Sequence, residues 1–325
     1  MATISIRHYH AAQKNLWDSF VDTTINSSFL FKRDFMEYHA DRFDDYSLMF
    51  FKKSKLVAVL PAHRLDNKLF SHNGLSYGGM LYTNSLSLKV AVELYQALLV
   101  QLVAAGITRL SLKPIPSIYR SSLHDPESLI FNQLKAKNKS IQQLSVIERA
   151  HRLPVKSSRK AEILKAEKSN INYVESNNYK EFWNELLVPR LRHKHQTNPV
   201  HSLQEIEKLK ARFPENIRLF LAYQQATPAA GICIFENEKV AHCQYIAVSD
   251  ALSATGALDG LTHWLITEVF AEKSYFDFGT SSEHKGKQIN HGLYFWKQSF
   301  GCISVSQEVY QIKTANHQTL SDLWT

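Results

Sequence analysis

The chain has 325 residues, of which 44% are hydrophobic and 21% are charged, a balance typical of folded domains. It contains no run of roughly 18 apolar residues, which a membrane span needs, and its first residues carry no apolar signal-peptide core. We therefore predict no membrane span and a cytoplasmic location. The formal charge of +8 favours polyanionic partners such as nucleotides, coenzyme A or tRNA, although scattered charges that serve only solubility are the open alternative.

Neither a metal site nor a nucleic-acid partner is expected. The cysteines, Cys233, Cys243 and Cys302, form no CxxC pair, so a disulfide framework and a cysteine zinc site both lack support. His193 and His195 form an HxH pair without the HExxH spacing of a zinc-binding helix. No tract alternates basic and aromatic residues as a groove for single-stranded nucleic acid would.

Taken in chain order, the first half predicts helices, antiparallel strands, another helix and a strand. Hydrophobic periodicity gives the type of each element, and Gly106 and a group of prolines end the last two. The predicted ranges are helices at 11–22 and 31–43, two strands within 46–65, a strand at LSYGGMLY (75–82), a helix at 87–106 and a strand at 107–116.

The second half repeats this order, as expected if one α/β unit occurs twice. Its predicted ranges are helices at 178–194 and 202–212, three strands within 218–248, a helix at 256–273 and a strand at 274–279. A basic helical segment at 157–169 lies between the halves. We place the boundary near 145–155, which predicts domains at 1–150 and 151–325.

Four stretches carry a resemblance to a known family. They are RKAEILKAEKS, PVHSLQEIEKLKARFPENIRLF (199–220), AHCQYIAVS (241–249) and FDFGTSSEHKGKQINHGLYFWKQSFG (276–301). In this order they resemble the tandem GNAT acyltransferases related to the Fem aminoacyl transferases. The first half resembles the family in element order and in GLSYGGMLY and KPIPSIY. The resemblance implies an α/β (α+β) fold of two GNAT-like domains in tandem, each with a mixed, mostly antiparallel sheet flanked by helices, whose facing surfaces form one active site.

The resemblance also implies where a donor would bind. GNAT domains hold the pantetheine arm along a strand and the diphosphate at the N-terminus of the next helix. The residues assigned to acyl-CoA are Gln244, Tyr245, Ile246, Val248, Ser253, Ala254, Thr255, Gly256 and Ala257. Because the turn 249–260 has no Lys or Arg and only two glycines, an ordinary strand-to-helix turn capped by Ser253 or Thr255 is the alternative.

Acyl transfer to an amine needs a base for the amine and donors for the oxyanion. The candidate catalytic residues are His242, His201, Glu283 and Lys297. Strict alternation along the strand places His242 on one face with Gln244, where a histidine of the core or wall is the alternative. Glu283 follows a strand end, where a mobile surface loop is the alternative.

Lys297 lies in a predicted helix, 290–300, that packs its aromatic residues inward and offers the lysine to an oxyanion. A lysine that extends along the surface into solvent is the alternative. The residues assigned to the acceptor substrate are Tyr77, Lys113, Arg192, His195, His284 and Asn290. The two glycines after Tyr77 permit close approach of a ligand, or equally mark a β-bulge.

These expectations combine into an acyltransferase that uses acyl-CoA as co-substrate, without a metal, and transfers groups other than aminoacyl groups. The expected acceptor is the amine of a dTDP- or UDP-linked amino sugar used for surface polysaccharide. The alternatives are a Fem-like transferase that uses aminoacyl-tRNA and a peptidoglycan precursor, and a non-catalytic binding protein on the same scaffold.

Overall fold

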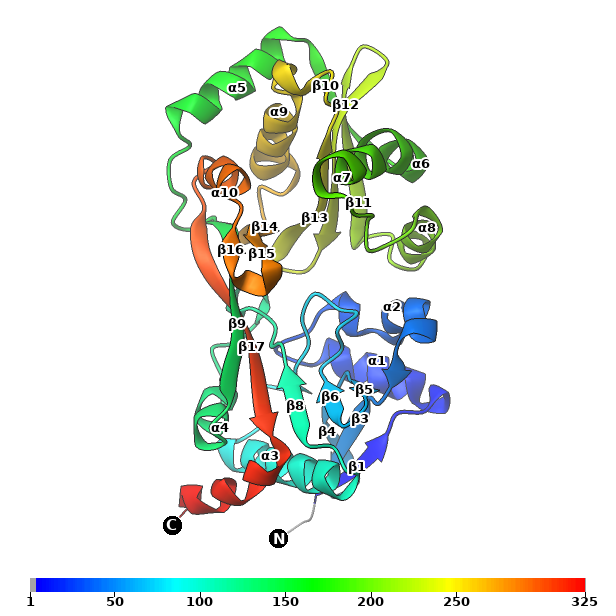
Figure 1. The fold of residues 1–325 in the computed structure, drawn as a ribbon, viewed down its shortest axis with the longest axis vertical. Coiled ribbons are helices and arrows are strands. Elements are labelled where there is room, and N and C mark those ends of the chain that lie inside the picture. Colours follow the sequence, from blue (N-terminus) through cyan, green and yellow to red (C-terminus); the bar gives the residue numbers. More distant parts are fainter. Residues whose placement is uncertain (1–3, 325) are drawn as a thin grey trace. The chain divides into compact units, whose positions relative to one another are not determined.

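A computed structural model describes residues 4–324, apart from the side chains of His195 and Lys285. Contacts between Cα atoms divide the chain into two compact units (Figure 1): residues up to Gln142 together with Ser306 onward, and Gln143–Val305. The chain crosses from one unit to the other within β9 (Lys137–Glu148) and again within β17 (Ile303–Lys313). The last segment therefore packs with the first unit, whereas the sequence analysis placed it in the second domain.

The first unit contains two sets of hydrogen-bonded strands. One has the order β1-β3-β4-β7 and is antiparallel, and the other runs β17-β8-β6-β5-β2 with β6 and β8 parallel. Helix α3 begins at the N-cap Ser87 and packs its apolar face on these strands. The elements are β1 (Ile4–His8), η1 (Ala11–Gln13), α1 (Lys14–Asp22), η2 (Phe29–Phe31), α2 (Arg33–Met36), η3 (Glu37–Arg42), β2 (Asp44–Asp45), β3 (Leu48–Lys52), β4 (Lys55–Leu60), β5 (His63–Leu65), β6 (Lys68–Phe70), β7 (Leu81–Tyr82), α3 (Leu88–Ala104), β8 (Arg109–Leu112), η4 (Ser117–Tyr119), α4 (Glu127–Gln133) and η9 (Thr314–Trp324).

The second unit has one main sheet of order β10-β11-β12-β13-β14-β9. Its strand pairs are antiparallel except β13 with β14. The elements are α5 (Ser157–Lys168), β10 (Ile171–Ser176), α6 (Tyr179–Glu181), the π-helix η5 (Phe182–Leu187), α7 (Val188–His195), α8 (Leu203–Arg212), β11 (Ile217–Gln224), β12 (Thr227–Glu236), β13 (Val240–Val248), η6 (Ser253–Thr255), α9 (Ala257–Trp264), the π-helix η7 (Leu265–Val269), β14 (Tyr275–Thr280), β15 (Ser282–Glu283), η8 (His284–Gly286), β16 (Gln288–Ile289) and α10 (His291–Gln298).

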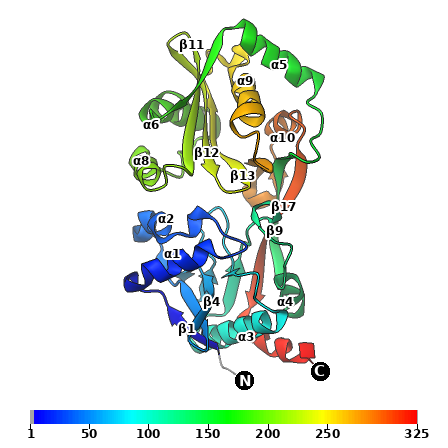
Figure 2. The same ribbon diagram turned by 180° about the vertical axis from the view of Figure 1, so that it is seen from behind.

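Helices cover both faces of the second unit's sheet. Helices α5 and α9 lie on one face, and α6, α7 and α8 lie on the other (Figures 1 and 2). On the α9 face, Leu261 and Leu265 pack with Phe276, Phe278 and Cys243 in one buried apolar cluster. Two buried faces explain why the central strands read as nearly continuous apolar runs.

The sequence predicted most helices and the strands β11, β12 and β13, but it missed the two longest strands, β9 and β17, and one predicted strand is wrong. Only Leu81 and Tyr82 of LSYGGMLY are in a strand, because Gly79 has a φ of +96° and Gly78 packs against Ser71 and forms an isolated bridge to Pro114. The predicted helix 31–43 is broken into 3-10 and short α-helical turns. Among residues 4–324, no helix combines the length and apolar character needed to cross a membrane.

Candidate active site

Strand β13 contains a β-bulge at Gln244. Across β12, Cys233 pairs with Tyr245 and Ile234 pairs with Cys243, so Gln244 has no partner in the ladder. A bulge of one residue reverses the alternation of side chains beyond it. Tyr245 therefore lies on the face of His242 and not on that of Cys243, as strict alternation would place it, and Cys243 points to the α9 core.

His242 is held by a buried carboxylate of the neighbouring strand. Its Nδ1 lies 2.9 Å from Oδ2 of Asp277, directly opposite in the parallel β13–β14 pair. Oδ1 of Asp277 accepts a hydrogen bond of 2.7 Å from the backbone N–H of Gly279. An ionised carboxylate only accepts, so opposite an ionised Asp277 a neutral imidazole carries its proton on Nδ1 and leaves Nε2 as an acceptor. The side chain of Asp277 is 1% exposed and that of His242 is 18% exposed, so the imidazole is the member of the pair that solvent or a ligand reaches.

Gly279 lets the end of β14 pass close to the imidazole. Its φ is +69°, and a Cβ at this position would lie 3.2 Å from Cε1 of His242. A side chain there would be strained by the backbone conformation and would crowd the ring. The glycine of the FDFG stretch is thus explained by the packing of the His242–Asp277 pair.

Lys297 is buried, which corrects the predicted orientation of its helix. The lysine is 2% exposed and its ammonium donates to the backbone carbonyls of Gly279, at 3.1 Å, and Thr280, at 2.8 Å. Phe295 instead points outward and is 57% exposed. Burial lowers the pKa of Lys297 to about 8, while the nearby Asp277 raises it. Two of the three ammonium N–H groups therefore hold the end of β14, where Gly279 packs against His242.

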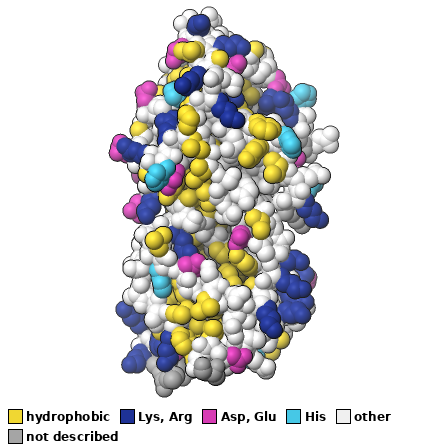
Figure 3. Space-filling view, turned by 90° about the vertical axis from the view of Figure 1, so that its left-hand side faces the viewer, with side chains coloured by type: hydrophobic (Ala, Val, Ile, Leu, Met, Phe, Trp, Pro, Cys, Tyr) yellow, Lys and Arg dark blue, Asp and Glu magenta, His cyan; other side chains and the backbone are white. Residues whose placement is uncertain are grey.

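Helix α10 leaves apolar side chains on the surface. Leu293 is 39% exposed and Phe295 is 57% exposed. Figure 3 views the side on which α10 lies in Figure 1, and hydrophobic side chains are exposed there among basic ones. The aromatic residues that do pack inward are Trp296 and Phe300, which contact Phe278.

His201 is a wall residue on the same sheet face as His242. Its Nδ1 lies 2.6 Å from the hydroxyl of Tyr245, and its backbone N–H donates to the same oxygen at 3.1 Å. Its ring contacts Phe235, which is paired with His242 across the ladder. The indole N–H of Trp183 donates to the His201 carbonyl. These hydrogen bonds fix His201, which lies just before α8, against β13, and they also occupy the hydroxyl of Tyr245.

The turn that follows β13 is packed against helix α5. A Cβ on Gly256, whose φ is +76°, would lie 2.2 Å from the carbonyl oxygen of Glu162. A Cβ on Gly260 would lie 1.9 Å from the hydroxyl of Tyr173 in β10 and 2.7 Å from Cβ of Ala166. The contact of α5 with α9 therefore explains Gly256, and Gly260 is explained by Tyr173 together with α5. The hydroxyl of Thr255 accepts a hydrogen bond from the backbone N–H of Ala257. Ser253 and Ala254 form the exposed part of the turn.

The residues after β14 form a small exposed hairpin. Glu283 is in β15, which pairs with β16, and its Oε1 accepts a hydrogen bond of 2.9 Å from the side chain of Asn290. The amide oxygen of Asn290 also caps α10 by accepting from the N–H of Leu293. His284 has a φ of +49° at the turn. Glu283 is therefore hydrogen-bonded to Asn290, and among the described residues it forms no hydrogen bond with His242.

Of the basic residues predicted to meet a substrate phosphate, Arg192 donates to the side chain of Asn198 at 3.1 Å. Arg190 and His193, one turn apart on α7, both face Asp250, the second residue after β13. The side chain of His195 lies outside the part of the chain that the structure describes. Helix α7 is thereby tied to the loop that starts the predicted donor turn.

Two further predicted substrate residues belong to the first unit. The hydroxyl of Tyr77 lies 3.0 Å from that of Ser28, and its ring packs on Phe31 and Tyr119. Lys113 follows β8, and burial lowers its pKa to about 8. Among the described residues, no group of His, Cys, Asp and Glu side chains is placed to hold a metal ion.

Asp277 and the bulge at Gln244 are site features that the sequence analysis missed. The signal for Asp277 was available, since an aspartate between two phenylalanines in a buried strand needs a partner. The bulge gave no signal in the apolar pattern of AHCQYIAVS. The amide oxygen of Gln244 is buried and has no hydrogen-bond partner among the described residues.

Comparison with solved structures shows that the chain has the tandem GNAT fold, as predicted from the sequence. The most informative solved structures are FemX, with a TM-score of 0.67 at 11% identity over 98% of this chain and 99% of that one, and L-PGS from Bacillus licheniformis, with a TM-score of 0.61 at 10% identity over 98% of both chains. A tandem GNAT protein from the clavulanic acid biosynthesis pathway gives a TM-score of 0.52 at 13% identity, over 96% of this chain and 98% of that chain. No protein-family model matches the sequence, and neither does any curated protein sequence.

Proposed function

We propose that the chain is an N-acyltransferase that moves an acyl group from an acyl-CoA thioester to the amine of a nucleotide-linked amino sugar. The observation that carries this proposal is the His242–Asp277 pair beside the bulge of β13 in a GNAT fold. Asp277 fixes the imidazole with Nε2 as acceptor, the state in which a histidine takes a proton from an attacking amine.

In the proposed reaction the amine nitrogen attacks the carbonyl carbon of the thioester, and Nε2 of His242 accepts the proton that the nitrogen loses. The carbon–sulfur bond then breaks, and the departing thiolate takes up that proton. Gln244 has no Cα partner in the β13–β12 ladder, and its backbone N–H is our candidate donor to the oxyanion. Lys297 acts through Gly279 by holding the strand end that packs against the imidazole.

The donor is proposed to lie along β13, at Gln244, Tyr245, Ile246 and Val248. Its diphosphate is proposed to meet the turn at Ser253 and Ala254 rather than at Gly256, since α5 covers the glycine. The acceptor rests on the resemblance described above, and Arg192, His195, His284 and Asn290 remain its proposed contacts in this unit. Arg192 would have to exchange its bond to Asn198 for the acceptor's phosphate.

The packing of Gly256 against α5 also favours a second candidate, a Fem-like transferase whose donor is an aminoacyl-tRNA. Such a donor brings its acyl group on a ribose ester and needs no diphosphate-binding turn. The overall likeness to FemX exceeds that to the tandem GNAT protein in TM-score, 0.67 against 0.52, which supports keeping this candidate.

Calorimetry with acetyl-CoA, followed by transfer assays on a panel of dTDP- and UDP-amino sugars, tests the first candidate. Saturable binding and acylation that His242→Ala removes would support it. If acetyl-CoA does not bind at 1 mM and aminoacyl-tRNA is turned over instead, the second candidate replaces it. Absence of both activities with a folded protein would overturn the catalytic proposal itself.

A further inference from the structure

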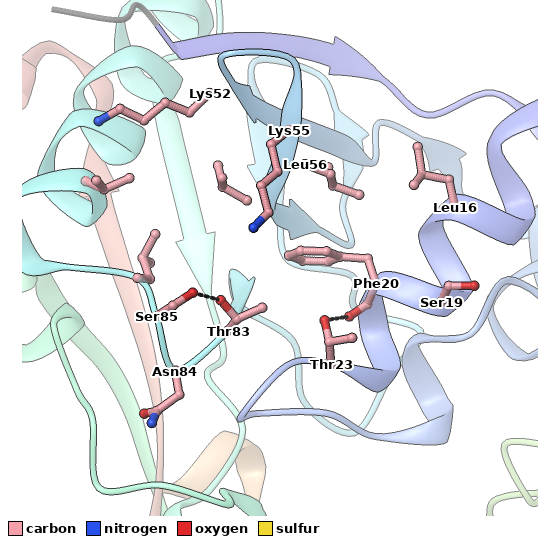
Figure 4. Close-up of a pocket in the computed structure, with 13 residues that line it drawn as sticks. Leu16, Ser19, Phe20, Thr23, Lys52, Lys55, Leu56, Thr83, Asn84 and Ser85 are labelled. Atoms are coloured by element: carbon pink, nitrogen blue, oxygen red, sulfur yellow. Dashed lines mark hydrogen bonds between the residues drawn. The ribbon is translucent and has the colours of Figure 1, made fainter.

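The first unit contains a cavity of about 790 Å³ that none of the residues discussed above lines. This volume lies within the range of about 300–1,000 Å³ that is usual for small-molecule sites. The walls come from α1, from the β3–β4 hairpin and from the turn that leads into α3 (Figure 4). The lining residues are Leu16, Ser19, Phe20, Thr23, Lys52, Lys55, Leu56, Val57, Thr83, Asn84, Ser85, Leu86 and Val90.

The cavity opens because two neighbouring strands separate. Strand β7 pairs with β4 only at Tyr82 with Ala58 and at Leu81 with Val59. Beyond that pair the chain turns away at Thr83 to reach α3, while β4 continues toward its start at Lys55. The space left between them is walled by apolar side chains of α1, including Leu16, which is 46% exposed. Apolar surface of this kind stays in contact with water unless a ligand covers it.

The charge in the cavity is positive. Lys52 is neutralised by Glu93 of α3, with 2.5 Å between Nζ and Oε2. Lys55 makes no ion pair among the described residues, and none of the lining residues is Asp or Glu. Figure 4 shows the ring of Phe20 and the ammonium of Lys55 pointing into the space, with Thr83 and Ser85 nearby; the hydroxyls of these two residues lie 2.8 Å apart.

We propose that this cavity binds a monomeric, single-chain amphiphile with an anionic head group. The carboxylate or phosphate of such a ligand meets Lys55 and the hydroxyls of Thr83 and Ser85, and its alkyl chain covers Phe20 and Leu16. The match is one of charge and polarity: a single unneutralised cation and two hydroxyls stand at one side of an otherwise mainly apolar space. None of the lining residues belongs to the proposed catalytic site, so this proposal does not rest on the proposed function.

Calorimetry of the full chain with sodium octanoate, decanoate and dodecanoate, each below its micelle concentration, tests the proposal. Burial of each added CH₂ group should raise affinity about threefold to fourfold. Lys55→Gln should weaken decanoate binding about twofold to fivefold, the range for an exposed charge pair, while binding of uncharged decanol stays the same. Phe20→Ala should weaken the binding of both decanoate and decanol.

Lys53→Gln is the matched control, because Lys53 is exposed in the turn of the same hairpin and does not line the cavity. It should bind decanoate as the unchanged protein does. Equal losses in Lys53→Gln and Lys55→Gln, an affinity that ignores chain length, or no saturable binding would overturn the proposal. Binding to phosphatidylglycerol vesicles without any binding of monomeric decanoate would do the same, since it would identify a membrane surface as the partner.

Discussion

Replacing Asp277 by Asn tests the candidate site without knowledge of its substrate. The carboxylate now accepts from two donors, Nδ1 of His242 and the N–H of Gly279. An asparagine has only one oxygen, and the backbone N–H of Gly279 cannot move away from it. If that oxygen keeps its bond to Gly279, the amide NH₂ faces Nδ1 of His242. The imidazole must then accept at Nδ1 and carry its proton on Nε2, so the substitution reverses the tautomer and removes the base.

The size of the effect follows from what is lost. A positioned general base contributes about 10²- to 10⁴-fold in rate, which corresponds to a barrier increase of about 3–5 kcal/mol. Stability should fall less, by about 1.5–3 kcal/mol, because one hydrogen bond to a charged group is replaced while the bond to Gly279 is kept. Turnover should thus decline much more than the free energy of unfolding.

Long-range ¹H–¹⁵N correlation spectra report the tautomer directly, and comparison with His242→Gln assigns the signal. The expected pattern is Nδ1–H in the unchanged protein and Nε2–H in Asp277→Asn. Asp259→Asn is the control: this buried carboxylate pairs with Arg159 and the indole of Trp296, so its loss should lower stability and leave the His242 tautomer alone. An unchanged tautomer and turnover within threefold in Asp277→Asn would refute the assignment of His242 as an oriented base.

Three further predictions concern stability, measured as the free energy of unfolding in urea. Gly256→Ala and Gly106→Ala both place a side chain at positive φ, +76° and +73° respectively, but only the side chain at Gly256 meets α5. Gly106→Ala should therefore lower stability by about 1–2 kcal/mol, and Gly256→Ala by at least about 1 kcal/mol more. Equal losses of stability would contradict the packing explanation for Gly256. The pKa of Lys297 is about 8 in the folded protein and 10.5 for a free lysine. Between these two pH values the unfolded chain binds more protons than the folded one, so the free energy of unfolding rises with pH, by at most about 3 kcal/mol. A Lys297→Met variant should lack this rise, and an identical pH profile would show that the lysine is not buried as described. Tyr245→Phe removes both bonds to His201 and should cost about 1–3 kcal/mol, whereas an unchanged midpoint would remove the structural role assigned to this tyrosine.

The sequence predicted those elements whose pattern is local. Helix 87–106 and the strands within 218–248 were recognisable because periodicity, N-caps and polar turns lie within each segment. Strands β9 and β17 were missed, since KNKSIQQLSVIE and ISVSQEVYQIK mix polar and apolar residues without the long apolar run of a central strand. Their partners are distant in sequence, and pairing of that kind leaves no local signal.

The two segments that meet at the candidate site were recognisable in the sequence, but the contact between them was not. FDFG and AHCQYIAVS were both singled out, yet the bond between His242 and Asp277 depends on a parallel register that no single segment encodes. The bulge at Gln244 then places Tyr245 on the face opposite to the one that strict alternation predicts. The amphipathic pattern of its helix led us to expect the ammonium of Lys297 on the accessible side of the helix. The ammonium is buried instead, because the backbone carbonyls at the end of β14 accept its hydrogen bonds and offset the cost of burying the charge.

The chain crosses between the two units twice, in β9 and in β17, and this affects the order in which the units can fold during synthesis. The first unit is complete only when Ser306 onward has joined it, since β17 pairs with β8 and η9 packs on α3. Gln133 and Thr319, for example, are joined by two hydrogen bonds although 186 residues separate them in the sequence. All residues of the second unit, Gln143–Val305, are translated before Ser306, so this unit is free to fold before the first unit is complete.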